Sequence, residues 1–125
     1  MATKPAFPGT PAITAGISLT GESLTDLYAA PGSGQGVLLG RLRAASTAAG
    51  AVTLQFVRNV GGADFVIGES QVPAGAGTNG ATAWKDLLAD VNMGLPMTLA
   101  PGEKLRVKAK SAPTKIDIIL EAAPL

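Results

Sequence analysis

The stretch VLLGRLRAASTAAGAVTLQFVRN, residues 37–59, indicates the fold class of this chain. Apolar and polar side chains alternate through residues 37–46 and again through residues 52–59, which is the period of a half-buried β-strand. The small residues 47–50 separate the two runs. Two such runs across a short turn predict a β-hairpin. The side chains expected to face the core are Leu38, Gly40, Leu42, Ala44, Val52, Leu54 and Phe56.

The same alternation recurs near the C-terminus. EKLRVKAK, residues 103–110, and TKIDIILEA, residues 114–122, are joined by SAPT, and together they predict a second hairpin. Its inward side chains are expected to be Leu105, Val107, Ala109, Ile116, Ile118 and Leu120. Shorter apolar runs predict further strands within 12–21, 23–31 and 59–72.

Two other segments have different patterns. Residues 73–82, PAGAGTNGAT, carry no large apolar side chain, which is typical of a surface loop. In residues 83–97, the spacing of Trp84, Leu87, Leu88 and Val91 fits a short helix that ends at Gly94 and Pro96.

Glycine and proline punctuate the chain between these runs. There are 16 glycines and 9 prolines, and the predicted strands recur at roughly the 8–12-residue spacing of a β-sandwich or jelly roll. Residues 13–125 are therefore expected to form one all-β, antiparallel β-sandwich or jelly-roll-like domain. Residues 1–12 contain Pro5, Pro8 and Pro11, which exclude a helix and predict an extended N-terminal arm.

Composition narrows the function classes. Charged residues make up 15% of the chain against about 25% in an average domain, and the net charge of +1 argues against a dedicated nucleic-acid binder. The chain has no cysteine and no histidine, which removes the thiol nucleophile, the commonest general base and the usual soft metal ligands. No stretch resembles a signal peptide or a membrane span of about 20 residues. We expect no membrane partner.

Carboxylates are the remaining candidates for acid–base chemistry. The nine of them fall singly at predicted turns and outward strand positions, and Asp86 and Asp90 lie on the solvent face of the predicted helix. A glycosidase needs two carboxylates facing each other across a cleft. The sequence therefore predicts no catalytic residues, no metal site, no cofactor and no enzymatic activity.

The cations are unevenly distributed. Five of the ten lie in the last predicted hairpin, and Arg106, Lys108 and Lys110 alternate with its core residues. Such a row either guards an edge strand against pairing with other sheets or forms a docking face for an acidic partner. A different hypothesis is a carbohydrate-binding site made from Trp84, Tyr28 and residues 73–83.

The stretch SLTGESLTDLYAAPGSGQGVLLGRLRAASTAAGAVTLQFVRN, followed by MTLAPGEKLRVKAK and IDIILEA, resembles small virion proteins of tailed bacteriophages over residues 15–122. The resemblance implies a head decoration or cement protein, made in the host cytoplasm and located on the capsid surface. Its partner would be the major capsid protein lattice, and it would act as a dimer or trimer. The alternative is a carbohydrate-binding module of a tail or fibre. The residues expected to bind the partner are Lys4, Pro5, Phe7, Pro8, Arg106, Lys108 and Lys110.

Overall fold

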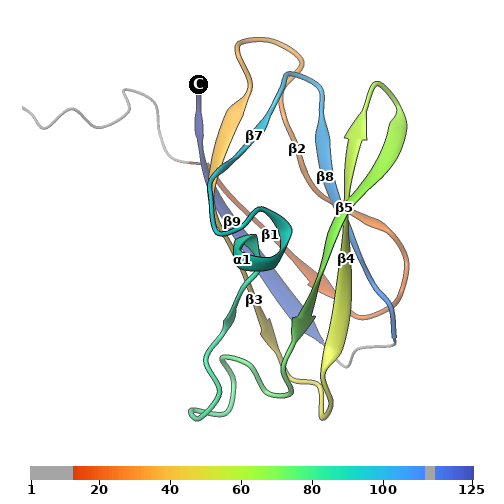
Figure 1. The fold of residues 1–125 in the computed structure, drawn as a ribbon, viewed down its shortest axis with the longest axis vertical. Helices are drawn as coiled ribbons and strands as arrows, with labels where there is room; N and C mark the ends of the chain where they lie inside the picture. The colour runs from red at the N-terminus through yellow and green to blue at the C-terminus, as the bar shows by residue number, and fades with distance from the viewer. Residues whose placement is uncertain (1–12, 112–114) are drawn as a thin grey trace, which may run out of the picture.

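The computed structural model describes residues 13–111 and 115–125, so the predicted arm at 1–12 lies outside the described residues. Two antiparallel sheets face each other, with one short helix at their side (Figure 1). The elements are β1 (Ile13–Leu19), β2 (Thr25–Ala29), β3 (Val37–Ser46), β4 (Val52–Val60), β5 (Ala63–Val72), β6 (Lys85–Asp86), α1 (Leu88–Val91), β7 (Met97–Leu99), β8 (Lys104–Ala109) and β9 (Ile116–Pro124). The predicted all-β sandwich is confirmed.

The strand order is that of a jelly roll. One sheet, called here the β1 sheet, has the order β1-β9-β3-β6, with β7 also paired to β3; the other, the β2 sheet, has the order β2-β8-β4-β5. The strand pairing is that of one long hairpin whose turn is at Gly61 and Gly62. Strands before the turn pair with strands after it: β4 with β5, β3 with β6 and β7, β2 with β8, and β1 with β9. Successive pairs fall in alternate sheets, which wraps the hairpin around one core.

Both predicted hairpins are wrong, although their strands are present. β3 pairs with β9, β6 and β7, whereas β4 pairs with β5 and β8 in the other sheet. In the same way, β8 and β9 belong to different sheets. Alternation shows that a strand has one buried face, but it does not show which strand lies beside it. Here the apolar faces of β3 and β4 face each other across the core, and residues 47–51 cross between the sheets.

The predicted inward face of β3 is wrong in its first half. Leu39 and Leu42 are both fully buried, while Leu38 is 36% exposed. A register shift against β9 between Leu39 and Arg41 inserts one extra residue and reverses the alternation. Leu42 and Ala44 face the core as predicted.

The predicted helix is much shorter than its apolar spacing indicated. Lys85 and Asp86 pair with β3 instead, and only Leu88–Val91 is helical. Leu87 and Leu88 are buried in the core cluster, so their spacing reports core contacts rather than a continuous helix. In the described parts of the chain, no helix has the length and apolar character needed to cross a membrane.

Candidate functional site

The predicted docking row lies in the middle of the β2 sheet. β8 is flanked by β2 on one side and β4 on the other, so the interpretation of this row as a guard for an edge strand is wrong. Arg106, Lys108 and Lys110 point outward, because the alternating Leu105, Val107 and Ala109 are buried in the core. Acidic residues from both sides of β8 reach this row.

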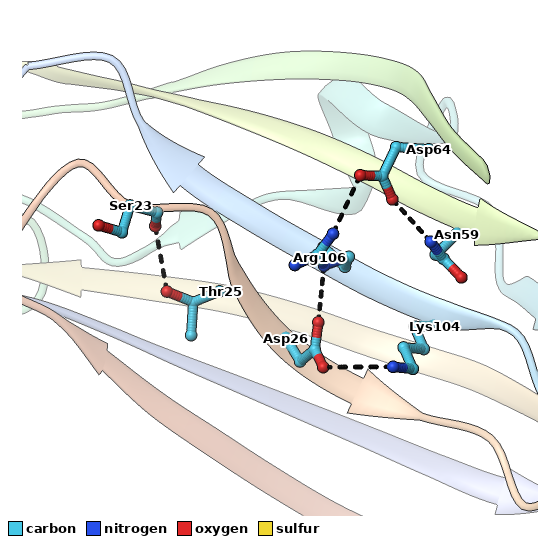
Figure 2. Close-up of polar contacts among 7 residues, drawn as sticks. All are labelled: Ser23, Thr25, Asp26, Asn59, Asp64, Lys104 and Arg106. Atoms are coloured by element: carbon cyan, nitrogen blue, oxygen red, sulfur yellow. Dashed lines mark hydrogen bonds and ion pairs between the residues drawn. The ribbon is translucent and has the colours of Figure 1, made fainter. Parts of the chain in front are cut away.

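Arg106 is the centre of an ion-pair network across the β2 sheet (Figure 2). Its Nε donates to Asp26 Oδ1 at 2.6 Å, and its Nη1 donates to Asp64 Oδ2 at 3.0 Å. Lys104 Nζ lies 3.7 Å from Asp26 Oδ2, and Asn59 Nδ2 donates to Asp64 Oδ1 at 2.8 Å. The Asn59 hydrogen bond and then the Arg106 guanidinium lower the pKa of Asp64, and the Asp26 carboxylate contributes most to raising the pKa of Arg106.

The network also covers an apolar side chain. Val57 lies directly opposite Arg106 in the pairing of β4 with β8, so the two side chains share the outer face. Val57 is only 4% exposed, yet it is not part of the core cluster between the sheets. The guanidinium of Arg106 is held on this face by two carboxylates, and the apolar stem of such a long side chain can cover an adjacent valine.

Lys110 has a separate acidic partner. Its Nζ lies 2.9 Å from Glu69 Oε2, which also accepts a hydrogen bond from Gln55 Nε2 at 3.1 Å. The Lys110 contact and then the Gln55 contact lower the pKa of Glu69. Lys108, by contrast, forms no ion pair within the part of the chain that the structure describes. The row is therefore largely neutralised by the protein itself, and a partner using Arg106 or Lys110 would compete with these carboxylates.

Most carboxylates of the described residues bind a cation, a hydroxyl, an amide or a backbone N–H. Asp26 and Asp64 approach each other only through Arg106, on an exposed strand face. Asp86 Oδ1 accepts a hydrogen bond from the backbone N–H of Leu88, whereas Asp90 binds Ser70 Oγ at 2.7 Å and Lys85 Nζ at 3.0 Å. Ser70 and then Lys85 lower the pKa of Asp90. Over residues 13–111 and 115–125, no cluster of three or more acidic, histidine or cysteine residues could hold a metal ion.

The structure separates the two aromatic residues of the carbohydrate hypothesis. Tyr28 is on β2 and packs, half-buried, against the core, whereas Trp84 precedes β6 at the opposite edge of the other sheet. Trp84 is 49% exposed and lies under the guanidinium of Arg43, 5.3 Å from its ring centre. The predicted loop does reach Trp84, because Gly77 lies against it and shares with it a hollow of about 150 Å³.

An apolar hairpin tip was not anticipated from the sequence. Phe65 and Val66 are 56% and 61% exposed at the start of β5, and Val60 is 39% exposed on the facing end of β4. The turn of this hairpin, at the upper right of Figure 1, extends past Asn59, the last residue of β4 that pairs with β8. Phe65 and Val66 lie near the turn, opposite Arg58 and Val57 of β4. A signal was present: Phe65, Val66 and Ile67 are consecutive apolar residues, so neighbours on opposite faces of one strand are both apolar.

The remaining predicted partner-binding residues, Lys4, Pro5, Phe7 and Pro8, lie outside the described residues.

Comparisons with known proteins give no sequence family. No protein-family model matches the chain, and no curated protein matches it. Among solved structures, the chain is similar to two crystal structures of a pentameric capsid protein isolated from metagenomic phage sequences. Their identities are 18% and 17%, and their TM-scores are 0.41 and 0.40 over 89% of this chain. The chain spans only 59% and 61% of those two proteins.

A third similar structure is that of the Gt strain of infectious bursal disease virus. Its identity is 15% and its TM-score is 0.33, over 99% of this chain and 37% of that one.

Proposed function

We propose that this protein is a structural component of a phage virion, a decoration or cement protein that binds the assembled head and stabilises it. The observation that carries the proposal is the exposed hairpin tip formed by Val60, Phe65 and Val66. Jelly rolls recur in viral capsid and lectin domains, and this strand order is compatible with either. The sequence resemblance to small virion proteins favours the first.

The hairpin tip has the properties of a protein-binding anchor. Binding energy in protein interfaces is concentrated in a few large side chains that enter pockets of the partner. Complete burial of a Phe or Val side chain contributes about 1.5–3 kcal/mol, and Phe65 and Val66 are more than half exposed. The hairpin closes in a tight turn, because Gly61 and Gly62 adopt the positive φ values of 61° and 87° that suit a two-residue hairpin turn.

Binding to an assembled shell would stabilise it by mass action. A ligand that binds the lattice but not the separated subunits shifts the equilibrium toward the lattice. Repeated attachment around the shell multiplies modest contacts when one bound unit touches more than one site. We propose that the arm, with Lys4, Pro5, Phe7 and Pro8, contributes a second contact, because a proline-rich segment loses little conformational entropy when it is ordered.

Arg106, Lys108 and Lys110 remain proposed docking residues. Among them Lys108 is the one without an ion pair in the described residues, and we assign it the larger share of any attraction to an acidic capsid surface.

The experiment that tests this function uses heads of the parent phage assembled without the protein. Purified protein is added, the heads are sedimented, and the temperature at which they release DNA is measured. We expect saturable co-sedimentation and a higher release temperature. Equal binding to unassembled capsid subunits, or the absence of the protein from purified virions, would contradict the proposal.

The alternative function, carbohydrate binding at a tail or fibre, is supported by one observation. Trp84 is half-exposed and lines two hollows, one shared with Gly77 and Ile119 and one shared with Gly40 and Asp86. A glycan array tests it. Binding that is lost in Trp84→Ala, with the fold intact, would favour this function over the capsid role.

A further inference from the structure

The sandwich leaves four sheet edges, and they differ in how they are protected. Unprotected edge strands pair with other chains, so natural edges are short, charged, bulged or covered. β2 has five residues, carries Asp26 and has a register shift beside it. β5 carries Asp64 and Glu69, and α1 packs against it at Gly68. β6 and β7 have only two and three residues.

β1 has none of these protective features. Its seven residues, ITAGISL, contain no charge and no proline, and they pair with β9 without a register shift from Ile13 to Leu19. No strand of the described chain pairs with its other side. In an antiparallel sheet, every second residue of such a strand directs its N–H and C=O toward the open edge. β1 therefore presents a row of backbone groups ready to accept another strand.

The side chains of β1 also lack a neighbour. Ile13, Ala15 and Ile17 pack against the core but are only partly buried, whereas their partners across the pairing with β9, Ala122, Leu120 and Ile118, are buried. The side chains of β1 are less buried than those of β9 because β1 is an edge strand, with a neighbouring strand on one side only. A further strand beside β1 would bury these three side chains.

We propose that the edge of β1 binds β1 of a second copy of this chain, antiparallel, about a two-fold axis at Gly16. In that register Ile13 lies opposite Leu19 and Ala15 opposite Ile17 on the core face. Thr14 lies opposite Ser18 on the outer face, and Gly16 lies opposite its own copy. Apolar residues meet apolar ones, small polar residues meet each other, and no like charges meet on β1. The contact uses the same patch on both copies, as a two-fold dimer requires.

Two observations favour a second copy over other occupants. The arm of the chain has proline at positions 5, 8 and 11, and each proline lacks the N–H that a strand ladder requires. A suitable partner strand must be uncharged, free of proline and about seven residues long, and β1 itself meets these conditions. The proposal does not depend on the capsid role, since it concerns the protein in isolation.

Analytical ultracentrifugation of the full chain tests the dimer. The interface is one strand pair, which is small, so we expect a dissociation constant of about 1–100 µM and a monomer–dimer equilibrium between about 1 and 300 µM. Hydrogen exchange should show alternate β1 amides becoming protected as the concentration rises. A full chain that stays monomeric at every concentration would overturn the proposal. It would do so even if deletion of residues 2–11 then produced a dimer, because the proposal concerns the full chain.

A charge-swap pair identifies the surface. Thr14→Lys with Ser18→Lys places like charges opposite each other twice across the axis, while within one copy each lysine lies beside Glu121 or Asp117 of β9. We expect this variant to fold normally and to dimerise at least about fivefold more weakly. Thr14→Glu with Ser18→Glu should also weaken the dimer, and an equimolar mixture of the two variants should restore it.

The matched control adds the same charge at other edges, with Ala29→Lys on β2 and Gln71→Lys on β5, both exposed positions. It should dimerise like the unaltered protein. A dimer that the β1 lysine variant leaves intact, or one that the control disrupts equally, would show that another surface is used and would overturn the assignment to β1.

Discussion

Arg58 of β4 and Glu103, the residue before β8, form an ion pair at one end of the sandwich. Glu103 Oε1 accepts hydrogen bonds from Arg58 Nη2 at 2.6 Å, from Arg58 Nε at 3.0 Å and from the backbone N–H of Ala100 at 2.9 Å. Arg58 Nη2 also donates to the carbonyl of Thr98, so a β4 side chain is bound to β7 of the other sheet. The hydrogen bond from Arg58 is the largest cause that lowers the pKa of Glu103. Burial raises this pKa and the Ala100 N–H lowers it, so that it is lowered overall.

Replacing Glu103 is expected to destabilise the fold. Glu103→Gln removes the charge, and Arg58 then keeps only a neutral acceptor, so we expect a loss of about 1 kcal/mol in the free energy of unfolding, measured by urea denaturation. Glu121→Gln is the control, because Glu121 lies 4.0 Å from Arg41 at an exposed site, where ion pairs contribute little. Equal losses in the two variants would contradict a stabilising role for the contact between Glu103 and Arg58.

Acid should destabilise the protein through its carboxylates. The pKa values of Asp64, Glu69, Asp90 and Glu103 are all lowered in the folded protein. A lowered folded pKa gives stability that is present above the unfolded pKa, about 4, and is lost as the pH falls through the folded value. With no histidine in the chain, the melting temperature should be nearly constant from about pH 5.5 to 7 and should fall below about pH 4.5.

The pH dependence can be assigned to particular residues. Glu103→Gln should flatten part of the decline in the melting temperature below about pH 4.5, because one of the four carboxylates with a lowered pKa is then absent. A maximum of stability near pH 4 in the unaltered protein would contradict the direction of these shifts.

Replacing Arg106 and replacing Lys108 should have different effects on the stability of the protein and on its binding to heads. Arg106→Ser breaks contacts to Asp26 and Asp64 and uncovers Val57, so we expect the melting temperature to fall by about 2–5 °C. Lys108→Ser should leave it unchanged, since Lys108 has no ion pair in the described residues, but should weaken head binding at low salt more than at high salt. Equal melting temperatures in the two variants would contradict the covering role of Arg106.

The hairpin tip should matter for attachment and not for folding. Phe65→Ser with Val66→Ser is expected to change the free energy of unfolding by less than about 0.5 kcal/mol, because both side chains are mostly exposed. Binding to heads should weaken at least about tenfold if the tip is an anchor. Met93→Ser with Leu95→Ser, an apolar pair that is also more than half exposed, is the control, and equal weakening by it would contradict a specific role for the tip.

Deletion of residues 2–11 should leave the sandwich folded. The buried core cluster of the described chain extends from Leu19 to Ala122, and the arm has only Phe7 as a large apolar residue. The melting temperature should therefore stay within a few degrees of the unaltered protein, while attachment to heads weakens. An unfolded product would show that the segment belongs to the core.

Local sequence features were sufficient to predict the longer strands, but not β6 and β7. The alternation at residues 37–46 and 52–59 identified β3 and β4, and the Gly61–Gly62 pair marks a turn that needs positive φ. The row of Arg106, Lys108 and Lys110 was correctly expected to face outward, because side chains alternate along any strand. Each of these features depends on neighbours within a few residues.

The tertiary structure alone decided which strands pair and which charges meet. β3 and β4 are consecutive in sequence but belong to opposite sheets, and the partners of Arg106 lie 80 and 42 residues away from it. An alternating pattern is satisfied by any neighbour that buries its apolar face, so it cannot select one. The strand order of the β2 sheet placed Asp26 and Asp64 beside Arg106, and the strand order of the other sheet left β1 at an open edge.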